Sequence, residues 1–335
     1  MDITSQYLVL ASNDALSDAG VTSVDLMGTN TGIFIGTLVA GLPFAEKYYR
    51  CCSRGKGSPA LASQVYRSSA AHHVASWFDI SGPCMTITTA CSASAHAVGL
   101  GADYIRAGKI DLAVIGGVDA FCEITWGGFF SLKSLSPGDI SPFDKNRSGI
   151  LLGEGSGVLI LESEERALAR KARIYGEVLG YGASCDAHHS TAPDPEGYGP
   201  ALAIRLAIKN AGIKLEEIDY INAHGTATKH NDVAETNAIK LAFGEIAYSV
   251  PVSSTKSMIG HMLGAAGIIE VIAVLGMIRD QVIYPTINYL TPDPECDLNY
   301  VPNNSVRATV EKVLSNSFGF GGNNAVLVVS KYRHH

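Results

Sequence analysis

Charged residues are scarce in this chain, and basic residues are the smaller share of them. Of the 335 residues, 17% are charged, with 25 Lys and Arg against 32 Asp and Glu, so the formal net charge is −7. The apolar fraction is 47%. This balance excludes a disordered or coiled-coil chain. The net negative charge also argues against a nucleic-acid binder that depends on a broad basic face.

Long apolar runs and cysteine pairs are missing as well. The longest apolar run, residues 263–278, is interrupted by Glu270. It is shorter than the ~20 residues that a membrane helix needs, so it predicts a core helix. No secretory signal opens the chain. The seven cysteines include no CxxC pair, so neither a disulfide framework nor a zinc site is indicated. These features predict a cytoplasmic protein.

Several widespread catalytic and nucleotide-binding motifs do not occur. The chain has no P-loop, and no GxGxxG follows its first strand, which leaves nucleotide-binding folds without support. A GxSxG nucleophile elbow and an HExxH pair are likewise missing. The sequence therefore does not support a serine hydrolase or a zinc protease.

What the chain does have is 35 glycines that separate short apolar segments. Strands are predicted at residues 32–36, 85–87, 111–117, 155–162, 174–179, 218–223, 314–318 and 325–330, and helices at 1–20, 93–108, 197–209 and 263–278. This alternation indicates an α/β fold with a mostly parallel sheet. The length suggests about two domains, and the charged run 162–173 divides the chain near its middle.

One cysteine lies where a strand should give way to a helix. Cys91 follows the strand-like residues 85–87 and opens a long helix of small residues. At the positive end of a helix dipole the pKa of a thiol is lowered, and backbone N–H groups are available to an oxyanion. A buried structural cysteine is an equally good interpretation of this segment taken alone.

Two further segments combine titratable residues with apolar surroundings. His224 ends an apolar strand, where catalytic groups gather in α/β sheets. Lys256 and His261 precede the apolar helix that carries Glu270. Each histidine alone is more often an ordinary packed side chain, but buried charges need partners. A cysteine with two histidines permits a thiol hydrolase, whereas the added lysine indicates a site that stabilises negative charge on a second carbonyl.

A glycine-rich loop at residues 316–324 completes the set of candidate segments. It has neither the lysine nor the Ser/Thr of a P-loop. We therefore expect its glycines to let the backbone approach a neighbouring site closely.

These four segments together resemble the elongating β-ketoacyl-[acyl-carrier-protein] synthases, which are type II KAS-like condensing enzymes of the thiolase superfamily. The motifs that carry the resemblance are TACSAS, NAHGTAT, STKSMIGHMLGAAG and NSFGFGGNN, with SPFDKNRSG, LLGEGSGVLILE and PTINYLTPDPECDLNYVPN between them. They match in order and spacing over essentially the whole chain. The resemblance implies an α/β thiolase-like fold. Its two pseudo-repeated βαβαβαββ halves, at 1–165 and 166–335, would form five α-β-α-β-α layers.

The resemblance also implies a role for each catalytic motif. Cys91 would be the nucleophile that accepts an acyl group from a carrier protein. His224 and His261 would hold the thioester carbonyl of a malonyl donor while it loses CO2. Lys256, tied to Glu270, would orient this pair. Such a condensation needs neither a redox cofactor nor a catalytic metal.

Other positions would contact the substrate or its carrier. The backbone N–H groups of Cys91 and Phe320 would form an oxyanion hole, with the Phe320 ring as a gate. By the same comparison, the substrate-binding residues are Thr226, Thr228, Glu270, Phe318 and Val39, and a structural monovalent cation could lie at Asn222, Glu270, Ser315 and Asn316. Lys56 and Lys133 are predicted to meet an acidic carrier protein, although ordinary solvated lysines are an equally good interpretation.

The chain departs from the family pattern in two ways. The family begins with a core strand and helices ahead of Met1, so we expect an open sheet edge. Asn323 stands where the family has a threonine. The predicted function is decarboxylative Claisen condensation by a homodimer in fatty-acid or polyketide-type elongation. A catalytically silent partner subunit of a heterodimer is the alternative, and retention of Cys91 counts against it. A thiolase or thioester hydrolase is disfavoured by the histidine pair.

Overall fold

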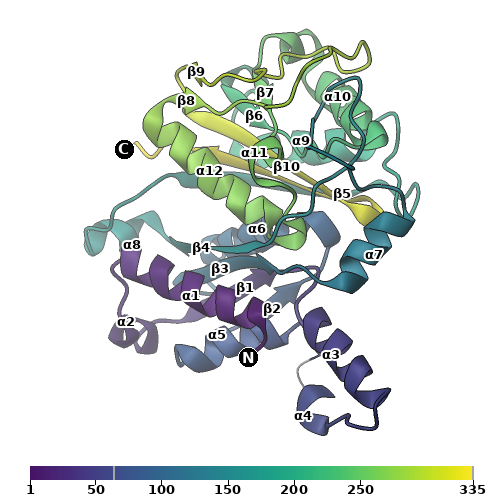
Figure 1. Cartoon of the computed structure of the whole chain (residues 1–335). Coiled ribbons are helices and arrows are strands. Elements are labelled where there is room, and N and C mark those ends of the chain that lie inside the picture. Colours follow the sequence, from purple (N-terminus) through teal and green to yellow (C-terminus); the bar gives the residue numbers. More distant parts are fainter. Residues whose placement is uncertain (63–64, 334–335) are drawn as a thin grey trace.

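The core of the described chain consists of two large β-sheets and three layers of helices, arranged alternately (Figure 1). The computed structural model describes residues 1–62 and 65–333. The main helices are α1 (Ile3–Asp18), α5 (Ser69–Trp77), α6 (Ala93–Arg106), α9 (Tyr198–Ala211), α10 (Lys229–Phe243) and α12 (Ala266–Asp280). Helices α6 and α12 lie between the sheets, α1 and α5 cover one outer face, and α9 and α10 cover the other. This five-layer α/β arrangement confirms the predicted fold class.

The first sheet contains four strands. They are β2 (Cys84–Ile87), β1 (Thr31–Gly36), β3 (Leu112–Asp119) and β4 (Gly155–Glu162), in this order across the sheet. Strand β1 runs parallel to both of its neighbours, and β4 runs antiparallel to β3. Strands β1 and β3 are buried along their whole length, as expected for strands covered by helices on both faces. Strands β2 and β4 form its two edges, and within the described residues β4 pairs only with β3.

The second sheet contains five strands. In order they are β5 (Glu177–Cys185), β11 (Asn323–Ser330), β10 (Lys312–Gly319), β6 (Tyr220–Asn222) and β7 (Val252–Ser253). Strands β10, β6 and β7 are parallel, whereas β10, β11 and β5 are antiparallel. The predicted mostly parallel sheet is therefore wrong on this side. Only the turn Phe320–Gly322 joins β10 to β11, and so short a connection joins antiparallel strands.

Strand β5 begins and ends later than the sequence predicts. The prediction placed it at 174–179. In the structure Gly180 and Gly182 lie inside the strand, directly beneath α9. A Cβ at Gly180 would lie 2.3 Å from the carbonyl oxygen of Ala207, and one at Gly182 would lie 2.1 Å from that of Ala203. These glycines therefore allow close helix–sheet packing rather than a turn.

The remaining elements are short. They are α2 (Ser23–Met27), α3 (Leu42–Cys52), α4 (Pro59–Ala62), α7 (Glu123–Ser131), α8 (Glu164–Ala169), α11 (Lys256–Ile259) and the strand pair β8 (Val282–Ile283) and β9 (Val306–Arg307). Helices α3 and α4 project from the body next to α7 (Figure 1). Within residues 1–62 and 65–333, no helix has the length and apolar character to cross a membrane.

The apolar core follows the layers. One large cluster lies under α9 and α10, a second lies between the sheets around α6 and α12, and a third lies under α1 and α5. A small fourth cluster contains Val39, Cys122, Phe129, Ile150 and Leu263, with Phe320 packed against it. This fourth cluster adjoins the candidate site.

Candidate active site

Cys91 lies at the turn between strand β2 and helix α6, as the sequence predicts. A short 3-10 turn, Ala90–Ser92, connects the two elements. Ala90 has a φ of 51°, which is uncommon for a residue with a side chain, and it bends the chain sharply into the helix. Cys91 is only 5% exposed. The backbone N–H of Phe320 donates a hydrogen bond to its thiol.

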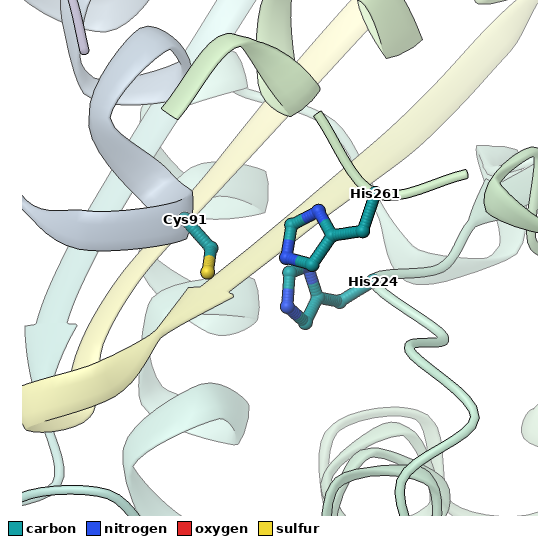
Figure 2. A group of neighbouring side chains, drawn as sticks. All are labelled: Cys91, His224 and His261. Atoms are coloured by element: carbon teal, nitrogen blue, oxygen red, sulfur yellow. The ribbon is translucent and has the colours of Figure 1, made fainter. Parts of the chain in front are cut away.

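Two histidines face Cys91 (Figure 2). His224 follows strand β6 and His261 follows α11, and their rings cross at 84° with centroids 5.4 Å apart. The Sγ of Cys91 and one nitrogen of each ring all lie within 4.8 Å of one another. All three side chains are buried. The structure thus brings together three residues that belong to separate sequence motifs.

A buried glutamate that the sequence analysis did not single out holds the His224 turn. Glu235 on α10 accepts the backbone N–H groups of His224 and Gly225, each at 2.8 Å, and the side-chain amide of Asn316 at 3.0 Å. Gly225 has a φ of 41°, and a Cβ there would lie 2.5 Å from the Cβ of Ser254. The sequence could have indicated Glu235. A carboxylate on the apolar face of a helix becomes buried, and a buried charge needs partners.

The main chain of His261 is fixed by a loop of the first half of the molecule. Its N–H donates to the carbonyl of Leu151 at 2.7 Å, and its carbonyl accepts the N–H of Gly153 at 3.0 Å. Neither ring nitrogen has a hydrogen-bond partner within residues 1–62 and 65–333, although both are buried. The ring nitrogen that faces Cys91 therefore has no competing hydrogen bond among the described residues.

Lys256 and Glu270 form an ion pair in which each side chain is only 1% exposed. The Nζ of Lys256 also lies 3.4 Å from Nδ1 of His224. A protonated lysine donates to that nitrogen and leaves the single proton of a neutral imidazole on Nε2. Lys256 thereby sets the tautomer of His224. Glu270, expected among the substrate-binding residues, contacts Lys256.

Burial controls the protonation of the three reactive groups. Desolvation lowers the pKa of both imidazoles well below 6.5, and the Lys256 ammonium lowers it further. Both rings are therefore neutral at pH 7. Burial raises the pKa of Cys91 to about 12, against the opposing attraction of Lys256. The expected lowering of this pKa by the helix dipole is wrong for the free protein, because desolvation of a thiolate outweighs it.

An apolar wall borders the site on the side of the glycine-rich loop. The ring of Phe320 contacts that of Phe129, with centroids 5.6 Å apart, and both belong to the cluster that contains the fully buried Val39. The ring of Phe318 lies 6.0 Å from that of His224. The structure therefore places Phe318 and Phe320 beside the reactive groups, and Val39 in the cluster against which Phe320 packs.

Asp119 is a second buried carboxylate that the sequence analysis missed. It ends strand β3 and accepts the hydroxyl of Thr37 at 2.7 Å and the N–H groups of Val39 and Gly264 at 2.8 and 2.6 Å. Burial raises its pKa to about 6. Asp119 thus ties the ends of two strands to the turn before α12. Two of these partners are backbone groups from distant segments, so no motif reveals them.

Thr226 and Thr228 extend from the His224 turn. Their hydroxyl groups lie 3.1 Å apart. The Thr228 hydroxyl also accepts the N–H of Asn231 and so caps α10. The buried guanidinium of Arg147 donates to the Thr228 carbonyl at 3.2 Å. This threonine segment is therefore held by both the helix and an interior arginine.

The two predicted carrier contacts, Lys56 and Lys133, are both exposed. Lys56 lies in the connection between α3 and α4, and Lys133 follows the end of α7. An ion pair between Arg50 and Glu123 joins α3 to α7. The two lysines thus belong to neighbouring surface segments.

The residues named for a monovalent cation share one buried region. Asn222 and Ser315 face each other across β6 and β10. Oε2 of Glu270 and Oδ1 of Asn316 are buried and lack a hydrogen-bond partner in the described part of the chain. Oxygen donors of this kind suit a hard cation, so the residues fit such an ion. These four residues would hold it.

Asn323, the second departure from the family pattern, has a local role in the glycine-rich turn. Its side-chain amide donates to the carbonyl of Phe320 at 3.0 Å. Between them Gly321 has a φ of 80°, a conformation that glycine adopts freely. The amide therefore closes the turn that presents Phe320 to the site.

The assembled groups can perform acyl transfer to sulfur and then activate a second carbonyl. A thiol supplies the covalent step, and neutral imidazole N–H groups can stabilise an enolate oxygen. Together with two stacked sheets, this centre defines a condensing enzyme of the thiolase fold.

Comparison with known proteins identifies the family. The profile described as "Beta-ketoacyl synthase, N-terminal domain" matches residues 1–167, and that described as "Beta-ketoacyl synthase, C-terminal domain" matches residues 175–290. The chain therefore belongs to the beta-ketoacyl synthase family. The predicted resemblance and the predicted acyltransferase class are confirmed.

Curated relatives agree over nearly the whole chain. The 3-oxoacyl-[acyl-carrier-protein] synthase 2 of Synechocystis sp. is 43% identical, and the alignment covers 99% of this chain and 82% of the relative. The protein of the same name from Coxiella burnetii is 40% identical, with 98% and 82% covered.

Solved structures show the same fold. The ishigamide ketosynthase/chain length factor is 41% identical with a TM-score of 0.92, covering 99% of this chain and 83% of that one. A type II PKS ketosynthase, solved in complex with its acyl-carrier protein, is 35% identical with a TM-score of 0.95, covering 99% and 86%.

Proposed function

We propose that this chain elongates carrier-bound acyl groups by decarboxylative condensation, with Cys91 as the nucleophile and His224 and His261 as the activating pair. The observation that carries the proposal is the convergence of the Cys91 sulfur and one nitrogen of each buried imidazole within 4.8 Å. The names of the curated relatives, which act on an acyl-carrier protein, support it. A site in which all three groups are assembled does not favour the alternative of a catalytically silent partner subunit.

The first half-reaction transfers the acyl group to the enzyme. The Cys91 sulfur attacks the carbonyl carbon of the acyl thioester while its proton passes to the unpartnered imidazole of His261. The backbone N–H groups of Cys91 and Phe320 hold the resulting oxyanion. A carbon–sulfur bond to Cys91 then replaces the one to the carrier, and the carrier thiol leaves with the proton.

The second half-reaction forms the carbon–carbon bond. The carboxylate of a carrier-bound malonyl group leaves as CO2, and its electron pair becomes the enolate. N–H donors on His224 and His261 hold the enolate oxygen, and each such donor contributes ~2.7–4 kcal/mol in comparable sites. The carbanion attacks the acyl-Cys91 carbonyl, and the Cys91 sulfur leaves as a thiolate. The thiolate then takes up one proton from water, which the overall condensation consumes.

Other parts of the structure support the handling of a carrier-bound chain. The apolar wall of Val39, Phe318 and Phe320 is suited to an acyl chain. Thr226 and Thr228 offer hydroxyl groups to a phosphopantetheine arm, and Glu270 acts through Lys256. We also propose a cytoplasmic homodimer, and a division into halves at residue 165/166, which falls within α8.

The test is the intact mass of the protein after incubation with acyl-carrier proteins of several chain lengths. Wild type should gain one acyl group, and Cys91→Ala should gain none, because only this thiol lies beside the two imidazoles. The exposed Cys185 offers a matched control, since Cys185→Ala should be acylated like wild type. Absence of an adduct on folded wild-type protein would contradict the proposal and favour the hypothesis of a catalytically silent partner subunit.

A further inference from the structure

The three reactive side chains of the site also have the composition of a metal-ligand set. The Sγ of Cys91 and one nitrogen each of His224 and His261 lie within 4.8 Å of one another, and all three side chains are buried (Figure 2). Thiolate sulfur and imidazole nitrogen are ligands that Zn²⁺ prefers, at distances of about 2.3 Å and 2.0–2.1 Å. A movement of about 1 Å would bring the three atoms to the spacing of a tetrahedral site.

Two of the three groups meet the requirements of such an ion. Both ring nitrogens of His261 are buried and lack a hydrogen-bond partner in the described part of the chain, so ligation by His261 would break no hydrogen bond there. Cys91 would release its thiol proton to solvent as the sulfur–metal bond forms, because the thiolate is the form that binds metals.

His224 differs from the other two groups because Lys256 contacts it. The Nζ of Lys256 lies 3.4 Å from Nδ1 of His224, so Nε2 is the nitrogen left to face Cys91 (Figure 2). An ammonium that donates to Nδ1 leaves the proton of the neutral ring on Nε2, where a metal needs a lone pair. Release of that proton would leave a buried imidazolate. Its transfer to Nδ1 would require Lys256 to give up the hydrogen bond or its charge.

We propose that Lys256 has a second role, which is to keep thiophilic divalent cations such as Zn²⁺ out of the centre formed by Cys91, His224 and His261. The proton that it fixes on His224 blocks one of the three ligand positions. Besides burial, the charge of the Lys256 ammonium acts on the pKa of all three groups, and a field that reaches all three also opposes the entry of a dication. Glu270 balances part of this charge but leaves the contact with His224 in place.

Binding of Co²⁺ tests this role, because a Co²⁺–thiolate bond absorbs in the near ultraviolet and so reports ligation by Cys91 without any measurement of activity. Wild type and Lys256→Met are treated with a chelator, dialysed and titrated with CoCl₂. The variant should bind Co²⁺ about 10- to 100-fold more tightly, which is the factor expected when a hydrogen bond from a charged group no longer has to be broken. The absorption should be missing from Lys256→Met/Cys91→Ala.

A second variant guards against loss of folding, because Lys256→Met leaves Glu270 buried without its partner. Lys256→Met/Glu270→Met removes one charge of each sign, and circular dichroism reports whether it is folded. It should bind Co²⁺ as tightly as Lys256→Met, since the proton of His224 can move to Nδ1 in both. The matched control is Lys240→Met, which removes a lysine that pairs with Asp297 in the last turn of α10. This control should bind Co²⁺ no more tightly than wild type.

Two results would overturn the proposal. If wild type binds Co²⁺ through Cys91 as tightly as a folded Lys256 variant does, the lysine does not exclude the metal. If neither variant shows the Co²⁺–thiolate absorption although it is folded, the three groups do not form a metal site and need no protection. Neither result bears on the proposed condensation, which is tested separately by acylation of Cys91.

Discussion

At the scale of single residues, the two active-site histidines should make the folded state sensitive to acid. Their pKa values lie well below 6.5 because of burial and the Lys256 ammonium. Below pH 6.5 the unfolded chain therefore binds more protons than the folded one, and the free energy of unfolding decreases. Between pH 7 and 5.5 the two imidazoles together should cost about 2 kcal/mol of stability.

Urea unfolding at a series of pH values checks this expectation against the His224→Asn/His261→Asn variant. Buried carboxyls act in the opposite direction, since burial raises the pKa of Glu235 to about 7 and that of Asp119 to about 6. The informative quantity is thus the difference between wild type and variant, which should shrink toward acid pH. A difference that is constant with pH would contradict the assignment of neutral histidines.

Residue-level prediction from sequence worked where a motif is contiguous. Cys91, His224, Lys256 and His261 each lie in a short run of residues whose order is informative. Glu235 was missed because its partners are backbone N–H groups that meet only after β6 and α10 pack. The protonation of Cys91 was misjudged for a related reason, since the depth of burial is a tertiary property.

At the scale of elements, the Lys256–Glu270 pair links the short helix α11 to α12 within the core. Lys256→Met should lower the free energy of unfolding by ~3–5 kcal/mol, because it leaves Glu270 buried without its partner. The second substitution, Glu270→Met, should restore most of this loss, since two apolar side chains replace two charges. Condensation should be lost in both variants, because the tautomer of His224 is no longer set.

The measurement is the free energy of unfolding by denaturant, compared among wild type, Lys256→Met and the double variant. A double variant that is as unstable as Lys256→Met would show that the pair itself, rather than the unpaired carboxylate, carries the stability. Binding of a structural cation by Glu270 would produce that result, because the double variant removes one of its ligands.

Element boundaries were predictable to different degrees. Strands β1 and β3 follow their sequence ranges closely because each is a continuous apolar run bounded by turn residues. Strand β5 does not follow its predicted range. A glycine that forms a turn and a glycine that allows a helix to pack closely cannot be told apart in a sequence, and Gly180 and Gly182 are of the second kind. The antiparallel pairing of β11 depends on the three-residue turn at Phe320–Gly322.

At the scale of the whole molecule, the two sheets differ at one edge. Strand β11 is paired on both sides, by β10 and β5, whereas β4 is paired only by β3 among the described residues. An apolar hollow of about 660 Å³ lies along β4, between α1, α6, α12 and β5, and includes Leu159 and Leu161.

Amide hydrogen exchange should reveal this asymmetry. In an antiparallel edge strand every second N–H points away from its partner, so alternate amides of β4 should exchange rapidly. The amides of β11 have partners on both sides and should be protected to near the global stability. Equal protection of the two strands, measured residue by residue in NMR, would mean that the β4 edge is covered in solution.

Residues 42–58, which include α3, contain four basic residues and a single acidic one, Glu46, and they give this acidic molecule an uneven electric field. Such a field orients an acidic protein before the two surfaces touch and raises the rate of productive encounters. At physiological salt it extends only ~8 Å from the surface, so it acts during the last step of approach. Salt would therefore slow the association of an acidic protein with this surface far more than it would speed its dissociation.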